Sequence, residues 1–340
     1  MKNKVTMQDI ADQLNISKNS VSQALSGKSG VSEDTRQIII ETADKLGYVY
    51  GKQKKKLSTL YSGNIGLIAS EFAFSKKNFF GEIYLSIEKE TSKRGMQLHI
   101  QSIDQTMRDR HILPPFIENH SVDGIIVLSH ISSDYIQKVL ETEIPTVIID
   151  HHEPGLQADC ILTNNRFGAF EAISHFIQLG HRDIGFIGNI DFSPSYYERM
   201  EGFRLAMHLH SLPVKPEWMI TDAREELDYV TRTVGALDRQ PTAWFCVNDG
   251  LGFMVHSTMQ QLGFSIPGDI SLCSYDNGQL SRMTTPLMTT MDIDLNRYGT
   301  LAAERLFWRI EHRNEPYLEM LLPATLIKRD STAPVSAAAE

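Results

Sequence analysis

The stretch TMQDIADQLNISKNSVSQAL, residues 6–25, decides how the first part of the chain folds. Thr6 and Asp9 have the spacing of a capping box at the start of a helix, and Ser17 can cap a second helix shortly after the first one ends. The apolar positions of both helices recur at helical spacing: Ile10, Ala11, Leu14, Val21, Ala24 and Leu25. A third amphipathic helix follows Ser32. Two helices joined by so tight a turn predict a helix-turn-helix.

The second of these helices is rich in weak helix formers. Residues 17–25 include three serines and an asparagine, whose short side chains compete with the backbone for hydrogen bonds. The side chains opposite its apolar face are Lys18, Asn19, Ser22 and Gln23. Asn and Gln can pair bidentately with adenine in the major groove, and Lys can reach guanine. This face favours DNA recognition, with a solvated three-helix cap domain as the alternative.

Charge is distributed unevenly along the chain. The net charge is −9, but residues 1–60 carry +4 and the other 280 residues carry −13. A basic head on an acidic body favours an anionic partner for the head. Residues 51–57, GKQKKKL, place four lysines directly before Leu57. After a helix-turn-helix, this pattern is typical of a segment whose lysines contact phosphates while the leucine wedges between base steps; the alternative is a solvated linker.

From residue 64 onward, apolar strand-like runs alternate with amphipathic helical segments. The predicted strands are NIGLIAS, GMQLHIQSI, VDGIIVLS, PTVIID, DIGFIG, AWFCVN, ISLCSYD and LMTTMD. This alternation predicts a parallel α/β architecture, and about ten strands favour two Rossmann-like lobes over one open sheet. A ligand crevice is expected between the lobes, at the carboxyl ends of the strands.

Composition narrows the class of protein further. Hydrophobic residues make up 41% and charged residues 22%, which is typical of a globular protein, and the apolar runs are too short to span a membrane. The first residues lack the apolar core of a secretory signal, so we expect a cytoplasmic protein. Cys160, Cys246 and Cys273 lie far apart without CxxC spacing, which predicts reduced, buried thiols.

The chain resembles the LacI family of bacterial transcriptional regulators from residue 5 to about residue 332. Its head resembles the family's helix-turn-helix, and five later segments match family landmarks in order: GHRDIGFIG, SYYERMEGFRLAM, NDGLGFMVHSTMQQLGFSIPGDISLCSYDN, PLMTTMDIDLNRYGTLAAERL and ATLIKRDST. The resemblance implies a homodimer that reads a pseudo-palindromic operator in double-stranded DNA, most often as a repressor. It also implies a body of the type I periplasmic-binding-protein kind, in which a small-molecule effector, a sugar or sugar derivative, binds between the lobes.

The predicted organisation combines an all-α head with an α/β core. The helix-turn-helix domain spans residues 1–50, the hinge 51–62, the effector-binding and dimerisation core 63–332 and the tail 333–340. Within the core, the N-lobe is expected at about 63–160 and 292–321, and the C-lobe at about 161–291 and 322–332. The tail has no leucine heptads, so a dimer is expected and a tetramer built on a terminal coiled coil is not.

The resemblance also assigns residues to DNA. Lys18, Asn19 and Gln23 match the family's base-reading positions, and Leu57 matches its intercalating hinge leucine. The full set expected at DNA is Thr6, Ser17, Lys18, Asn19, Ser20, Ser22, Gln23, Lys54, Lys55, Lys56 and Leu57. Two positions depart from the family: Gln23 stands where arginine is usual, which favours adenine over guanine, and residues 50–51 read Tyr-Gly where the hinge usually opens with Pro-Asn.

Several polar residues fall where strands end and a crevice is expected. The candidate effector-binding residues are Phe79, Phe80, Asp150, Arg199, Asn248 and Asp276. Carboxylates, an amide and a guanidinium can bind sugar hydroxyls, and an aromatic ring can stack on a sugar or base face. The alternatives are that Phe80 belongs to the core and that the carboxylates cap helices, above all Asp249, before a helix expected from Gly250. The stretch TDAREELDYV offers only Tyr229 as a ring, so the ligand class stays open.

Two other functions compete with this reading. Asp150-His151-His152 is similar to the signature of DHH phosphoesterases, but neighbouring histidines in a strand point to opposite sides. No Walker loop, GxGxxG or GxSxG motif and no histidine–carboxylate cluster at metal spacing is present, so neither catalysis, a cofactor nor a metal is expected. A periplasmic solute receptor would share the body, but the basic helical head argues against it.

Overall fold

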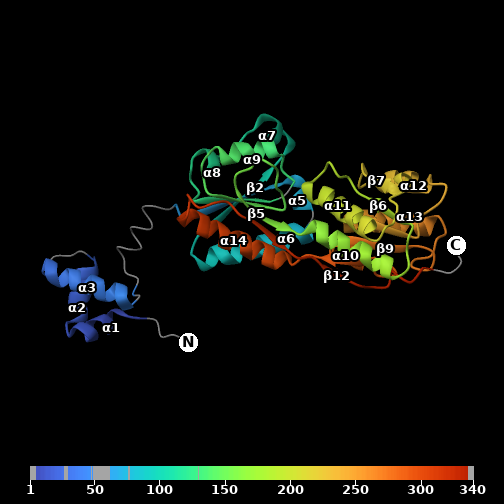
Figure 1. The fold of residues 1–340 in the computed structure, drawn as a ribbon. Helices are drawn as coiled ribbons and strands as arrows, with labels where there is room; N and C mark the ends of the chain where they lie inside the picture. Colours follow the sequence, from blue (N-terminus) through green and yellow to red (C-terminus); the bar gives the residue numbers. More distant parts are fainter. Residues whose placement is uncertain are drawn as a thin grey trace. The chain divides into compact units, whose positions relative to one another are not determined.

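The computed structural model describes residues 5–26, 30–46, 48, 62–75, 77–128 and 130–335. The chain divides into two compact units, a head at residues 1–63 and a body at residues 64–340 (Figure 1). The predicted hinge residues Lys54, Lys55, Lys56 and Leu57, together with residues 50–51, lie outside the described residues.

In the described residues of the head, the structure has the helices α1 (Met7–Leu14), α2 (Lys18–Ser26) and α3 (Glu33–Leu46). The predicted capping box is present, because Thr6 N–H donates to Asp9 Oδ2 over 2.6 Å while Asp9 N–H donates to Thr6 Oγ1 over 3.4 Å. α1 ends at Asn15, whose φ of 52° is left-handed and turns the chain toward α2. The three helices share one apolar core: Ile10, Ala11, Val21, Ala24, Leu25, Ile39 and Ala43. The predicted helix-turn-helix is confirmed.

The first lobe of the body is a six-stranded sheet in the order β11-β5-β4-β3-β1-β2, with every neighbouring pair parallel. Its strands are β1 (Asn64–Ser70), β2 (Gln97–Ile103), β3 (Gly124–Leu128), β4 (Thr146–Ile149), β5 (Asp159–Thr163) and β11 (Glu319–Leu322). Its helices are α5 (Glu71–Ser75), α6 (Lys77–Lys93), α7 (Gln105–Arg110), α8 (Pro115–Glu118), α9 (Ser133–Leu140) and α14 (Leu295–Glu311). A Cβ at Gly299 would lie 2.5 Å from the Ile83 carbonyl oxygen, so glycine is what lets α14 pack this closely on α6.

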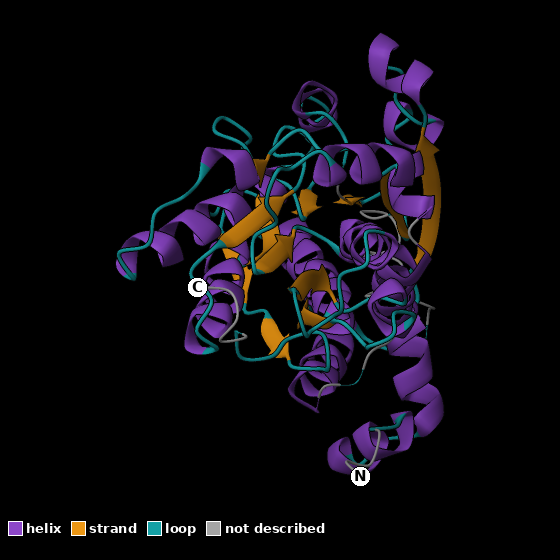
Figure 2. Ribbon diagram, turned by 90° about the vertical axis from the view of Figure 1, so that its right-hand side faces the viewer, coloured by secondary structure: helices purple, strands orange, loops and turns teal. Residues whose placement is uncertain are grey.

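The second lobe is another six-stranded sheet, in the order β12-β10-β9-β8-β6-β7. Its strands are β6 (Ile184–Ile187), β7 (Met219–Ile220), β8 (Ala243–Cys246), β9 (Ser271–Asp276), β10 (Thr289–Asp292) and β12 (Thr325–Ile327), the last antiparallel to β10. Its helices are α10 (Asn165–Gln178), α11 (Pro194–Leu209), α12 (Leu227–Gly235) and α13 (Asp249–Gln261), with short 3-10 turns η1 (Pro216–Trp218) and η2 (Leu280–Arg282). Helices and strands are combined throughout the body (Figure 2), and its two separate sheets confirm the predicted pair of α/β lobes.

The chain passes between the lobes three times. The first passage follows β5 at residue 164, the second follows β10 at residues 293–294, and the third joins β11 to β12 at residues 323–324. The first and third passages touch, because Asn164 N–H donates to the Leu322 carbonyl oxygen over 2.8 Å. The first and third passages therefore lie side by side and form a hinge on one side of the crevice between the lobes.

Three lobe boundaries differ from the predicted ones. Residues 161–163 were assigned to the second lobe, but they pair with β11 in the first sheet. Residue 292 belongs to the second sheet through its pairing with residue 276, and residue 322 belongs to the first through its pairing with residue 163. The hydrogen-bonded register sets where each strand ends, and the sequence does not show that register.

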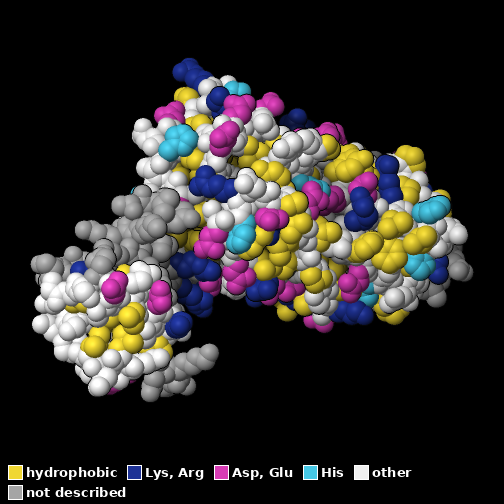
Figure 3. All heavy atoms as spheres, turned by 60° about the vertical axis from the view of Figure 1, so that its left-hand side comes forward, with side chains coloured by type: hydrophobic (Ala, Val, Ile, Leu, Met, Phe, Trp, Pro, Cys, Tyr) yellow, Lys and Arg dark blue, Asp and Glu magenta, His cyan; other side chains and the backbone are white. Residues whose placement is uncertain are grey.

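The three cysteines are buried and form no disulfide, as predicted. None of the helices in the described part of the chain has the length and apolar run that a bilayer crossing needs. On the face of the body seen in Figure 3, acidic and basic side chains are interspersed, so this face presents no single basic patch.

Candidate DNA and effector sites

The second helix of the head presents polar side chains on the face opposite its core. Val21, Ala24 and Leu25 are buried against α1 and α3, whereas Lys18 and Asn19 are exposed. Ser22 and Gln23 are half-buried at the edge of the same helix. The inner face thus holds α2 firmly while its outer face offers an ammonium, an amide and a hydroxyl for contact with base edges.

Two of the residues expected at DNA also serve as caps within the head. Thr6 caps α1, as described above, and Ser17 caps α2 by accepting a 3.0 Å hydrogen bond from Ser20 N–H. The hydroxyls of Ser17 and Ser20 lie 2.8 Å apart. Their backbone amides lie at the start of the helix, where a DNA phosphate can be bound. Contact of these residues with DNA stays a prediction.

Arg36 was missed by sequence reasoning. Its guanidinium donates to the carbonyl oxygens of Ala24, over 2.7 Å, and Gln23, over 3.3 Å. These are among the last carbonyls of α2, which have no partner inside their own helix. Arg36 therefore fixes the end of α2 to α3. The sequence showed an arginine early in the third helix, but only the packing of the helices shows that this arginine binds the end of α2.

Arg199 of α11 is buried beside the carboxyl ends of β8 and β9. It is 3% exposed, and its guanidinium donates to Asn165 Oδ1 over 2.9 Å and to the Val247 carbonyl oxygen over 2.6 Å. Its Nη1 lies 3.3 Å from Asp276 Oδ1, and its guanidinium carbon lies 3.7 Å from the ring centroid of Tyr275. Burial alone would lower the pKa of Arg199. The nearby groups, Asp276 foremost, outweigh this effect and raise the pKa of Arg199 above its usual range. The site holds a fixed positive charge beside a partly exposed carboxylate.

The cap of α13 is Asn248 and not Asp249. Asn248 caps α13, accepting a 2.8 Å hydrogen bond from Leu251 N–H, and Asp249 is the first helical residue. The Asn248 amide also donates to Tyr196 Oη over 2.6 Å and to Glu225 Oε1 over 2.5 Å. The predicted cap at Asp249 is therefore wrong, because the helix begins one residue earlier than expected. As the cap, Asn248 still places its amide between Tyr196 and Glu225.

Asp249 instead lies buried inside the second lobe. Its carboxylate accepts hydrogen bonds from Ser274 Oγ over 2.5 Å and from Thr290 Oγ1 over 2.9 Å. Burial, followed by the charge of Asp276, raises the pKa of Asp249 to about 7. These bonds tie the start of α13 to β9 and β10 behind the crevice.

Three residues at or just after the ends of strands have a left-handed backbone. His130 follows β3 with φ 58°, Asp150 follows β4 with φ 55°, and Asp276 ends β9 with φ 99°. This conformation is uncommon for residues other than glycine and is often found at ligand sites. Asp150 is also close enough to Arg199 to raise the pKa of that arginine. Asp150, Arg199, Asn248 and Asp276 therefore meet in one region of the body.

The two predicted aromatic residues do not share this arrangement. The Phe80 ring lies 4.1 Å from that of Phe74 and 6.0 Å from that of Tyr84, centroid to centroid, and only 9% of Phe80 is exposed. This packing favours the core alternative for Phe80. Phe79 is half-buried one residue earlier. Contact of either ring with an effector stays a prediction.

Another aromatic cluster spans the two lobes and was not predicted. Phe192 lies 4.9 Å from His130 and 5.9 Å from Tyr196 between ring centroids. A pocket of about 640 Å³ beside it is lined from the first lobe by Arg108, residues 130–134, His151 and Glu153, and from the second by residues 190–194. Because both lobes line this space, a molecule bound there would contact both.

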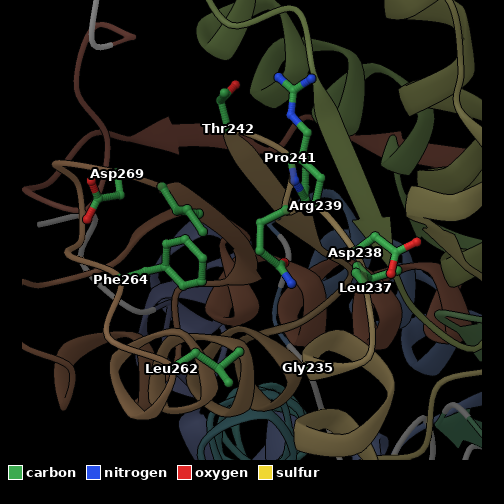
Figure 4. A pocket seen from close by; sticks show the side chains of 11 residues that line it. Gly235, Leu237, Asp238, Arg239, Pro241, Thr242, Leu262, Phe264 and Asp269 are labelled. Carbon is green, nitrogen blue, oxygen red and sulfur yellow. The ribbon is translucent and has the colours of Figure 1, made fainter. Parts of the chain in front are cut away.

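A further hollow lies at the opposite edge of the second sheet (Figure 4). It is lined by residues 235, 237–242, 262, 264, 269 and 270, which precede β8 and β9 or end the helices before them. Figure 4 shows Phe264 and Leu262 on one side and Arg239 on the other. Arg239 is already paired with Asp183 over 2.9 Å. In open α/β sheets ligands bind at the carboxyl ends of the strands, so the interlobe region is the better candidate.

The two histidines after Asp150 point to different partners. His151 Nε2 lies 3.0 Å from Ser133 Oγ, whereas His152 lies between Glu198 of α11 and Glu319 of β11. Among the residues that the structure describes, no three His, Cys, Asp or Glu side chains are placed to hold a metal ion. This arrangement does not fit the metal centre that a DHH phosphoesterase requires.

His152 makes stability depend on pH. Its hydrogen bond with Glu198, helped by the one with Glu319, raises its pKa from 6.5 to about 9. The folded state therefore binds this proton more tightly than the unfolded chain, so the stabilisation is complete below about pH 6.5 and is lost as the pH rises through 9. After allowance for solvent screening, we expect His152→Gln to cost about 1–2 kcal/mol at pH 6 and almost nothing at pH 10.

Denaturant unfolding of both proteins across this pH range would measure the difference in unfolding free energy. A difference that stays constant from pH 6 to pH 10 would show that the proton on His152 does not contribute.

A helix-turn-helix head and a two-lobed α/β body with a polar region between its lobes together define the class of ligand-controlled transcriptional regulators. Residues 6–50 match the model of bacterial regulatory proteins of the lacI family, and residues 173–332 match that of the periplasmic binding protein-like domain. The chain is 30% identical over 320 residues to the HTH-type transcriptional repressor PurR of Actinobacillus pleuropneumoniae serotype 3 (strain JL03), covering 90% of this chain and 91% of that protein. The chain belongs to the LacI family.

Solved structures agree with this assignment. A LacI family regulator from Enterococcus faecium with bound ribose is 25% identical, with a TM-score of 0.68 over 80% of this chain and all of that chain. The lac repressor dimer bound to operator and an anti-inducer has the same fold, with a TM-score of 0.72, 20% identity and coverage of 97% of this chain and 100% of that one.

Proposed function

We propose that the protein is a transcriptional repressor that binds a pseudo-palindromic operator as a homodimer and is controlled by a small-molecule effector. The observation that carries this proposal is the outer face of α2, where Lys18 and Asn19 are exposed on a helix fixed by its core and by Arg36. The repressor PurR and the operator-bound lac repressor dimer support it as relatives. The match of the head to the lacI family favours a regulator over a periplasmic solute receptor. We propose no catalytic activity for the protein, and we propose that it acts on DNA in the cytoplasm.

The proposed effector is a sugar or sugar derivative bound near Arg199. The guanidinium of Arg199 and the carboxylate of Asp276 form a charged pair, and the Asn248 amide lies close by through Tyr196. Such groups can hold the hydroxyls of a sugar from both sides. The related regulator with bound ribose supports this class of ligand.

The proposed mechanism is a shift between two arrangements of the lobes. An effector that contacts both lobes favours the arrangement in which its contacts are best, and the hinge segments of the dimer then change their separation. Its effect on the operator is limited by the ratio of its affinities for the two arrangements. In DNA, Lys18, Asn19 and Gln23 are proposed to read bases, while Leu57 is proposed to wedge between base steps at the operator centre.

The experiment that tests this function is capture of random-sequence and genomic DNA by the purified protein at physiological salt, followed by sequencing. We expect one pseudo-palindromic site, with adenine where Gln23 reaches each half-site. If no site is enriched, either alone or with a small-molecule cell extract added, the proposed function is wrong.

Replacing Lys54, Lys55 and Lys56 by glutamine should flatten the salt dependence of operator binding. Each phosphate contact that is lost should lower the log–log slope by about 0.9, because fewer counterions are released from DNA. Fluorescence anisotropy titrations from low to high salt would measure the slope. The matched control is Lys138→Gln, which lies on α9 of the body and should leave it unchanged. A slope that is equal in the triple variant and the wild type would remove these lysines from the interface.

A further inference from the structure

His152 lies between two carboxylates. Its Nε2 is 3.0 Å from Glu198 Oε1 and its Nδ1 is 3.1 Å from Glu319 Oε1. An ionised carboxylate can only accept, so both ring nitrogens must donate, and the ring must be the imidazolium. The geometry thus requires a positive charge at this position.

This charge connects the two lobes. His152 follows β4 and Glu319 begins β11, and both strands belong to the first sheet. Glu198 lies on α11 of the second lobe. The side chains of His152 and Glu198 are 28% and 21% exposed, so the pair is partly withdrawn from water. Breaking it would leave Glu198 without its charged partner at the junction of the lobes.

The same network continues to Arg199. Asn165 Nδ2 donates to Glu198 Oε2 over 2.9 Å, and its Oδ1 accepts from Arg199 Nε over 2.9 Å. Asn165 is 2% exposed and directly follows the first passage between the lobes. At Gly202 the backbones of α10 and α11 are so close that a Cβ would collide with the Arg166 carbonyl oxygen. Asn165 therefore joins Glu198 to Arg199, where α11 is packed tightly on α10.

We propose that His152 is a positioning residue that sets the angle between the lobes. As an imidazolium between Glu198 and Glu319, it holds α11, and with it Arg199, in a fixed place against the first lobe. Without this charge, the arrangement seen in the structure loses the ion pair between His152 of the first lobe and Glu198 of the second, and the alternative arrangement becomes more populated. That a change in the angle between the lobes alters operator affinity rests on the proposed function. The effect of His152 on the angle itself does not.

An ordinary surface ion pair would not have this effect. Lys138 and Glu141 lie 3.0 Å apart, but both are about half exposed and both belong to the first lobe at the end of α9. Exposed pairs of this kind contribute little. The pair of His152 with Glu198 differs because it crosses between lobes and is coupled to a buried arginine. Lys138→Gln is therefore the matched control.

The test measures the distance between the lobes, and it needs neither DNA nor effector. Spin labels would be attached at Asp109→Cys on α7 and Asp228→Cys on α12, both exposed positions on different lobes. The three natural cysteines are buried and would remain unlabelled. Dilution with unlabelled protein restricts the measured distances to one chain, and pulsed electron spin resonance gives their distribution. Failure of this test and failure of the proposed function are thus separate results.

We expect one dominant distance in the wild-type background and in Lys138→Gln. In His152→Gln the population at other distances should rise about tenfold relative to the dominant one. Glu198→Gln should do the same, and the double variant should add little to either single variant, because one tie is lost in each case. Distributions in His152→Gln and Glu198→Gln that match the wild type would overturn the proposal.

A pH titration of the wild-type background tests the same inference without a substitution in the tie. The ring faces Glu198 and Glu319, with His151 and Glu153 next to it in the chain and Arg166 beyond Glu198. The second population should grow as the pH rises through about 9, where His152 loses its proton, and His152→Gln should show no such change. An equal pH response in both proteins would contradict the assignment to His152.

Discussion

Arg199→Ala should weaken effector binding by about a hundredfold or more and leave operator binding by the effector-free protein intact. The substitution removes a buried guanidinium that binds Asn165, the Val247 carbonyl oxygen and Asp276 at once. Truncating one partner of a buried, hydrogen-bonded charge pair at a binding interface typically costs about 2–5 kcal/mol, and the middle of that range corresponds to a few hundredfold in affinity. The head is a separate compact unit, so its helix-turn-helix should fold as before.

The measurement is isothermal calorimetry with whichever compound in a panel of sugars and sugar acids gives wild-type protein the largest thermal stabilisation. Arg204→Ala is the matched control, because Arg204 is exposed on the same helix five residues further on. Operator binding by each variant shows that it is folded. Wild-type affinity for the compound in Arg199→Ala would reject the role of this residue.

Gln23→Arg should change the base preferred at one position in each half-site from adenine to guanine. Glutamine matches the donor and acceptor pattern of adenine in the major groove, and arginine matches that of guanine. A bidentate pair contributes about 1–3 kcal/mol of discrimination, which is roughly a five- to 150-fold preference in each half-site. The Gln23 side chain is half-buried at the edge of α2, close to Gly30.

Capture of random DNA by each protein would show the change. Gln37→Arg on α3 adds the same charge to an exposed position of the head and should leave base preference unchanged while strengthening binding in general. Identical sites recovered by wild type and Gln23→Arg would mean that this residue does not read a base.

Much of the fold follows from local sequence patterns. The capping box at Thr6, the tight turn before Ser17 and the apolar spacing of both helices were sufficient for the head, because each is a local signal. Apolar runs such as NIGLIAS also predicted most of the strands, but the buried strand β5 and the short strand β7 were missed. The edge strands β11 and β12 were not predicted, since they are only four and three residues long and partly exposed. Such strands are defined by the neighbour they pair with, which the sequence does not show.

The candidate site was harder to predict than the fold. Position after a strand was a useful guide to Asp150 and Asp276, and the structure brings both near Arg199. The cap of α13 was misplaced by one residue, because Asn248 and Asp249 are both good caps and only the register of β8 decides between them. Asn165, Tyr196 and Tyr275 were missed, since their importance comes from contacts with residues more than thirty positions away.

The central claim is that the effector region of the body and the DNA-binding face of the head are coupled. The most direct test is to measure operator affinity with and without a saturating effector, and effector affinity with and without operator, in the same buffer. Thermodynamic linkage requires both affinities to change by the same factor, which is about 5–150 in typical allosteric proteins. We predict equal factors in this range. An operator affinity that stays the same while the effector is demonstrably bound would contradict the account.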